Sequence, residues 1–137
     1  MDTATVFLCD TTEDAVAEHL SGMYPAQRDP WVSMVNGDVA LYINMIAGCQ
    51  DIQAEMEPDD WEALISMLGR EPDVCVTADV SGRHHGSREP ERFALELLAS
   101  FNGLAQDLFA DHFWTLTELR SGHRVEGRRF FGPSSIS

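Results

Sequence analysis

WVSMVNGDVALYINMI, residues 31–46, is the stretch that says most about the fold of this chain. Two runs rich in β-forming residues flank Asn36-Gly37, a dipeptide that favours a two-residue turn with positive φ at both central positions. The stretch therefore predicts a β-hairpin. In its second arm, every other residue from Val39 to Met45 is large and apolar, so we expect a sheet with one covered face.

The segments around the hairpin predict further strands and helices. The runs TATVFLCD, residues 3–10, and DVCVTADV, residues 73–80, are short and rich in β-forming residues. Apolar residues recur at helical spacing after Thr11, Pro58 and Pro90, and these three residues suit a helix start. We therefore expect an α+β fold with a ferredoxin-like β-α-β-β-α-β core, an added helix and one or two short carboxy-terminal strands.

The carboxy-terminal region has two interpretations. The runs LAQDLF and HFWTLTEL are candidates for short strands. Thr115 with Glu118 equally fits a capping box that would start a final turn of helix. Taking the chain as a whole, we expect one α+β domain over residues 1–123 and a loosely ordered tail over residues 124–137.

Composition and cysteine content indicate the class of protein. Of the 137 residues, 44% are hydrophobic and 23% are charged, as in an ordinary globular domain. The amino terminus is acidic, and no apolar stretch is long enough for a signal-peptide core or a membrane span. Cys9, Cys49 and Cys75 include no closely spaced pair, which argues against a disulfide framework or a zinc knuckle. We expect a cytoplasmic protein whose cysteines are small buried hydrophobic residues.

Acidic residues dominate the first half of the chain. The net charge is −14. Residues 1–79 hold sixteen Asp and Glu against two Arg, whereas residues 80–137 hold seven of each sign. Every basic residue is arginine, which we take as a sign of a GC-rich bacterial coding sequence. The acidic half has the wrong sign of charge for binding nucleic acid.

The acidic excess is densest in GCQDIQAEMEPDDWEALISML, residues 48–68, which holds six carboxylates and no basic residue. Acids in the first turn of a helix complement its dipole, but half of these precede the predicted helix. Such a run is either a solvated face or a surface kept for a cationic partner. Trp31 at the hairpin entry could supply an aromatic anchor for that partner. The predicted partner-binding residues are Asp51, Glu55, Glu57, Asp59, Asp60 and Trp31.

Catalytic motifs are missing from the sequence. The chain contains no G-x-S-x-G elbow and no P-loop. Cys75 lies in a predicted strand, an inert environment for a thiol. His84 and His85 are adjacent in an extended loop and would point to opposite sides, while His112 and His123 are expected on the surface. We therefore predict a protein that is not an enzyme and that binds no cofactor and no metal.

FALELLASFNGLAQDLFADHFWTLTEL, residues 93–119, resembles the carboxy-terminal part of immunity proteins, the small acidic proteins found beside bacterial polymorphic toxins. The shared pattern is a helix ending near Phe101, an acidic spacer and Trp114-Thr115-Leu116. The resemblance covers a minor part of the chain and implies a protein that binds and blocks one cognate toxin in the cytoplasm. It transfers no catalytic residue and no binding position.

The acidic run and the resemblance lead to a main hypothesis and two alternatives. The main hypothesis is an inhibitor whose carboxylates cover the cationic active site of a basic toxin, expected to be a nuclease. The first alternative is a small-molecule-binding or regulatory module of ferredoxin-like type that acts as a homodimer through its sheet. The second alternative is an enzyme that uses His84 or His85.

Overall fold

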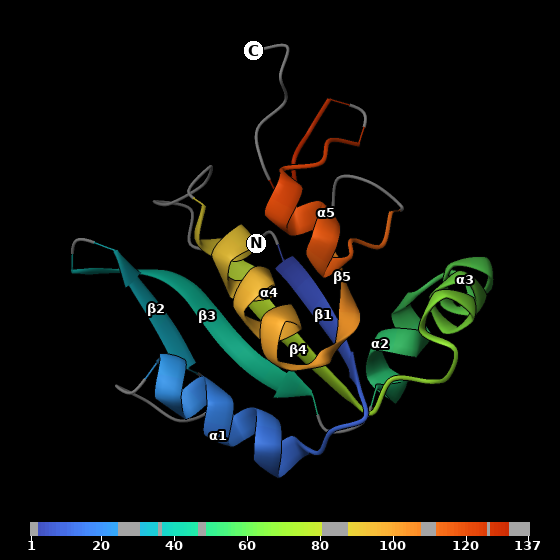
Figure 1. The fold of residues 1–137 in the computed structure, drawn as a ribbon. Coiled ribbons are helices and arrows are strands. Elements are labelled where there is room, and N and C mark those ends of the chain that lie inside the picture. Colours follow the sequence, from blue (N-terminus) through green and yellow to red (C-terminus); the bar gives the residue numbers. More distant parts are fainter. Residues whose placement is uncertain are drawn as a thin grey trace.

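One five-stranded antiparallel sheet and five helices make up the part of the protein that the computed structural model describes, residues 3–24, 31–35, 37–46, 49–80, 88–107, 112–125 and 127–131 (Figure 1). The α+β class is as predicted. The strand order is β2-β3-β4-β1-β5. Along the chain, the elements are β1 (Thr3–Cys9), α1 (Glu13–Met23), β2 (Trp31–Val35), β3 (Asp38–Ile46), α2 (Gln50–Glu55), α3 (Pro58–Leu68), β4 (Val74–Val80), α4 (Glu89–Ser100), β5 (Asn102–Gln106) and α5 (Leu116–Ser121).

The predicted hairpin is present. β2 pairs with β3 in antiparallel register, with Trp31 opposite Ile43. Gly37 in the turn has a φ of 84°, the positive value that the turn requires. Asn36 lies outside the described residues.

The ferredoxin-like strand order is not confirmed. β4 lies between β3 and β1, and every neighbouring pair in the sheet is antiparallel. β1 and β2, which flank α1, therefore run in opposite directions and do not form a split βαβ unit. The split unit is β4-α4-β5, two parallel strands with β1 between them. The alternation of side chains predicts which face a strand buries, but it contains nothing about which strand lies beside it.

The main core lies on the sheet face that α1, α4 and α5 cover. Every second residue of the central strands points into it, including Val6 of β1, Ile43 of β3 and Val76 of β4. The alternation predicted for β3 and β4 is thereby confirmed. Figure 1 shows α1 and α4 on the same side of the sheet. The helices contribute Val16, Leu20, Phe93, Ala94, Leu97, Leu98 and Leu119.

A second, smaller core covers part of the opposite face. Phe7, Cys75 and Leu104 occupy matching positions on β1, β4 and β5, and α3 packs Trp61 and Leu64 against them. Trp61 is buried, as its helical spacing predicted. The expectation of a sheet covered on one face only does not hold, because α3 shields the apolar end of the second face.

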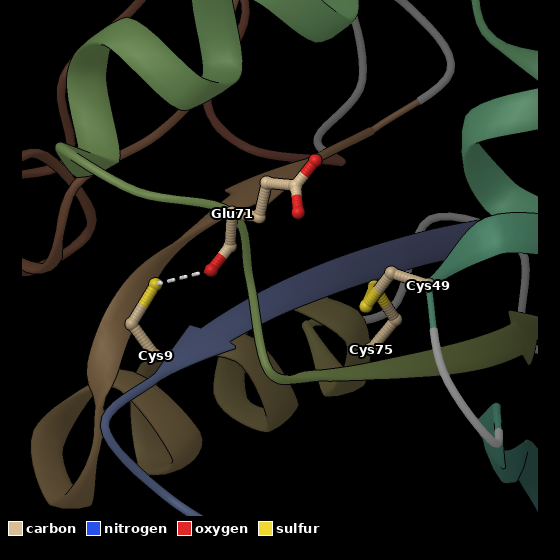
Figure 2. Close-up of a disulfide and its surroundings, with 4 residues drawn as sticks. All are labelled: Cys9, Cys49, Glu71 and Cys75. Atoms are coloured by element: carbon tan, nitrogen blue, oxygen red, sulfur yellow. Dashed lines mark hydrogen bonds between the residues drawn. A yellow bond between two sulfur atoms is a disulfide. The ribbon is translucent and has the colours of Figure 1, made fainter.

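A disulfide joins Cys49, just before α2, to Cys75 in β4 (Figure 2). Their Cα atoms are 5.7 Å apart although 26 residues separate them in sequence. The expectation of three unlinked cysteines is therefore corrected, because sequence spacing contains no sign that the fold brings this pair together. Cys9 is free and buried, and its thiol points to the carbonyl oxygen of Glu71 (Figure 2). Burial, and then the nearby Asp73, raise the pKa of the Cys9 thiol.

Capping residues explain where the helices start. Thr12, not Thr11, caps α1 through its side chain. Thr115 and Glu118 form the capping box of α5, so the helical interpretation of that stretch is correct, and Trp114 adds only an isolated strand bridge. α2 has no side-chain cap and no buried residue, which is why the sequence pattern did not predict it.

Part of the predicted tail packs on the domain. Phe130 and Phe131 are both buried in the main core. The Phe131 N–H donates a hydrogen bond to Asp107 at 2.8 Å, which ties this segment to the end of β5. Residues 132–137 lie outside the described residues.

Candidate functional site

The second face of the sheet becomes polar beyond the end that α3 covers. Thr3 of β1 pairs with Asp79 of β4, and Thr5 lies between Thr77 of β4 and Gln106 of β5. These side chains stand on the same face as the second core, because side chains alternate along each strand. The face therefore offers a polar floor next to a small apolar core.

A groove of about 450 Å³ lies between this polar floor and α2. α2 forms one wall with Asp51, Ile52 and Glu55. Asp79 on the floor and Asp107 after β5 add two further carboxylates. Acidic side chains from three separate segments thus line one space, which we call the acidic groove.

The four carboxylates of the acidic groove differ in how firmly they are held. Asp79 accepts a hydrogen bond from the Thr3 hydroxyl at 2.6 Å. Asp107 is 6% exposed and accepts a backbone N–H at 2.8 Å. Asp51 and Glu55 are exposed and, within the described residues, make no hydrogen bond or ion pair. The groove therefore combines two oriented carboxylates with two that are free to bind a cation.

The other acidic residues of the prediction lie at the start of α3, which follows the groove-lining residue Met56 along the chain. Glu57 is the N-cap residue of α3, and Asp59 and Asp60 lie in its first turn. Glu57 and Asp59 are exposed, and Asp60 is half-buried. None of the three has a basic partner in the described part of the chain, and their charge complements the helix dipole. The structure thus divides the predicted acids between the acidic groove and the adjoining start of α3.

Trp31 is not on this surface. Its side chain is 4% exposed and belongs to the main core. The indole Nε1–H donates a hydrogen bond to the hydroxyl of Ser21 in α1 at 3.1 Å. Such a side chain offers almost no area to a partner, so Trp31 is corrected from a predicted anchor to a core residue.

No match to this chain was found among protein-family models, curated proteins or solved structures. The resemblance of residues 93–119 to immunity proteins therefore remains a prediction. In the structure, this segment forms most of α4, all of β5 and the start of α5. Many of its apolar residues lie in the two cores, so that much of the segment serves the fold.

Asp79 and Asp107 are the groove carboxylates that the sequence did not predict. The sequence contains a sign of the position of Asp79, because the alternation in β4 puts Asp79 on the same polar face as Thr77. It contains no such sign for Asp107, because the place of Asp107 depends on β5 lying beside β1. A search for acidic runs finds carboxylates that are neighbours in sequence and overlooks those that a sheet brings together.

Two histidines form a second polar cluster around α5. His112 Nε2 lies 3.0 Å from both carboxylate oxygens of Glu118, and His123 Nε2 lies 3.3 Å from Oε2. Glu118 Oε1 also accepts the Thr115 N–H of the capping box. Burial opposes ionisation of Glu118, but the Thr115 N–H, His112 and His123 together lower its pKa. Within the described residues, this cluster is the group whose side chains suit a metal ion.

Proposed function

We propose that this protein binds a cationic protein toxin through the acidic groove and the adjoining start of α3, and neutralises it without catalysis. The observation that supports this most directly is the convergence of Asp51, Glu55 and Asp79 on one groove, where the buried Asp107 adds a further negative charge to the lining. Carboxylates form strong charge-assisted hydrogen bonds with Arg and Lys. Because Asp79 is already oriented by a hydrogen bond from Thr3, less ordering is required when a partner binds.

Electrostatics favours a partner that binds quickly. The chain has a net charge of −14, and Asp51, Glu55 and Glu57 have no basic partner in the described part of the chain. A cationic partner relieves the repulsion among these acids and is steered to them at rates up to about 10⁸–10⁹ M⁻¹s⁻¹ at low salt. A nuclease needs a cationic active site to hold nucleic acid, so we expect the toxin to be a nuclease.

The resemblance to immunity proteins implies that this protein acts in the cytoplasm. No helix among the described residues is long and apolar enough to cross a membrane. The structure contains the Cys49–Cys75 disulfide. Disulfides persist in oxidising compartments, and the reducing cytoplasm usually keeps cysteines as thiols. A protein that acts in the cytoplasm therefore has to keep its fold when this bond is reduced.

The two alternative functions have less support. A homodimer formed through the sheet needs an exposed apolar sheet face, whereas the part of the second face that α3 leaves uncovered is polar. An enzyme that uses His84 or His85 stays a prediction, because both residues lie outside the described residues. A small cationic molecule could also occupy the acidic groove. The binding experiment has to distinguish such a ligand from a protein partner.

Binding is tested with the purified full-length protein and the toxin domains encoded next to its gene, by isothermal titration calorimetry at low salt. Asp51→Asn with Glu55→Gln is expected to raise Kd at least about tenfold, because each charge-assisted hydrogen bond contributes about 1.5–3 kcal/mol. The matched control is Asp14→Asn with Glu18→Gln, which removes two exposed acids at the same spacing from α1. We expect the control to change Kd less than about threefold.

The control shows whether a loss of affinity is specific to the groove carboxylates or follows from any reduction in negative charge. Equal losses of affinity in the two double variants would remove the acidic groove from the proposal. Asp59→Asn with Asp60→Asn tests the start of α3 separately, and is expected to weaken binding and its salt dependence. Growth of a bacterial host that expresses the toxin, with and without this protein, measures neutralisation, and growth arrest in both cases would exclude an immunity role.

A further inference from the structure

The cluster of His112, Glu118 and His123 has the composition of a metal site. Imidazole nitrogens and carboxylate oxygens are common ligands of Zn²⁺ in proteins. One ligand atom from each of the three residues lies within 4.8 Å of the other two. Their side chains are 31%, 23% and 46% exposed, so an ion could enter from solvent.

We propose that these three side chains bind a divalent first-row transition-metal ion, with Zn²⁺ as the best fit, and leave a fourth coordination position open to solvent. Ligands placed about 2.0–2.1 Å from a tetrahedral zinc are about 3.3 Å from one another. Glu118 Oε2 lies 3.0 Å from His112 Nε2 and 3.3 Å from His123 Nε2. The ligand atoms of the two histidines lie within 4.8 Å of each other, and His123 is the more exposed of the two.

The surrounding structure holds each ligand near this position. The ring of His112 packs edge-on against Trp114, with centroids 5.0 Å apart, and Trp114 is 1% exposed in the main core. Glu118 is oriented by the capping box. His123 follows Gly122, whose left-handed conformation (φ 69°) ends α5 and turns the chain back. Supporting contacts of this type raise metal affinity because they fix the ligands before the ion arrives.

The charges near the cluster are compatible with a cation. Glu118 supplies one negative charge, and a neutral imidazole binds the ion through Nε2 while Nδ1 keeps the proton. Arg129 reaches the same turn, beside Gly122, but its guanidinium lies 3.0 Å from Glu91 Oε1, which offsets its charge. The ion would replace the histidine-to-carboxylate hydrogen bonds with metal–ligand bonds.

The test uses the untagged full-length protein, stripped of metal with a chelator, and Zn²⁺ alone as the ligand. Competition with a chromogenic zinc chelator is expected to show a single bound ion per chain. Co²⁺ in place of Zn²⁺ is expected to give the strong visible absorption of a tetrahedral site, in contrast to the weak absorption of the hydrated octahedral ion.

Glu118→Gln and His123→Ala are the informative variants. Glutamine at this helix position retains the capping hydrogen bond, and His123 is exposed, so both variants should fold. Each is expected to weaken Zn²⁺ binding at least about tenfold, since even loss of a supporting residue costs about 10–100-fold. His84→Ala with His85→Ala is the control that removes two histidines elsewhere in the chain, and it should bind Zn²⁺ as the wild type does.

A second measurement separates binding from a change in fold. Zn²⁺ is expected to raise the thermal unfolding midpoint of the wild type and not that of Glu118→Gln, because a ligand that binds only the folded state stabilises it. Failure of the wild type to bind Zn²⁺ would overturn the proposal. Equal binding by the wild type and His123→Ala, or loss of binding in the His84/His85 control, would also overturn it.

Discussion

At Gly103, β5 approaches β1 so closely that a side chain has no room. A Cβ atom at this position would clash with the carbonyl oxygen of Phe7. We expect Gly103→Ala to lower the free energy of unfolding by about 3 kcal/mol, the upper end of the range for overpacking. The cost is high because the clash is with a backbone atom, which cannot change rotamer to relieve it as a side chain can. Urea unfolding followed by tryptophan fluorescence measures the change.

Gly22 in α1 provides the matched control. Among the described residues, and apart from the adjacent residues and the backbone of α1 itself, no atom lies within 4 Å of the position that its Cβ would take. Gly22→Ala is therefore expected to raise the free energy of unfolding by about 0.5–1 kcal/mol, since alanine favours a helix over glycine. A comparable loss in both variants would show that the contact with Phe7 is not the cause.

Among the elements, α2 packs on the second core through the partly buried Ile52 and is also tied to the sheet by the Cys49–Cys75 disulfide. None of the residues of α2 is fully buried, and the disulfide ties its start to β4. Closing a loop of 26 residues restricts the unfolded chain by about 3.5 kcal/mol. Reduction is expected to lower the free energy of unfolding by about this amount and to leave the protein folded, because domains commonly have about 5–15 kcal/mol.

Urea unfolding with and without a reductant measures the contribution of the disulfide. In the Cys49→Ser/Cys75→Ala double variant, the reductant should have no effect. A reductant effect that persists in this variant, or free thiols at all three cysteines in the purified protein, would contradict this account of α2. A folded reduced protein is also what a cytoplasmic role requires.

At the scale of the whole molecule, the net charge of −14 opposes folding. Like charges are closer together in the folded protein than in the expanded chain, and the Debye length falls from about 30 Å at 0.01 M salt to about 3 Å at 1 M. We expect the urea midpoint to rise with NaCl over this range, and to rise less in the Asp51→Asn/Glu55→Gln variant. KCl should have the same effect at the same ionic strength. A urea midpoint that does not change with salt would contradict the claim that repulsion among the acids opposes folding, which is the repulsion that a partner is proposed to relieve.

Periodic patterns in the sequence were enough to predict most of the elements. The alternation in β3 and β4 and the helical spacing around Trp61 were correct because each reflects the geometry of a single element. The Thr115–Glu118 capping box was one of two interpretations of its segment, because the same residues also fitted a short strand. α2 was missed because it is short, has no side-chain cap and has no buried residue. Its sequence therefore shows no apolar repeat at helical spacing.

The acidic excess, the α+β class and most of the elements follow from neighbours along the chain, and the order of the residues is enough to predict them. The strand order, the Cys49–Cys75 disulfide and the acidic groove arise instead from the packing of segments distant in sequence. A residue pattern states which face of an element is apolar. Which elements meet on that face depends on how all of them pack together, and so Asp79 and Asp107 join Asp51 and Glu55 only when the sheet forms.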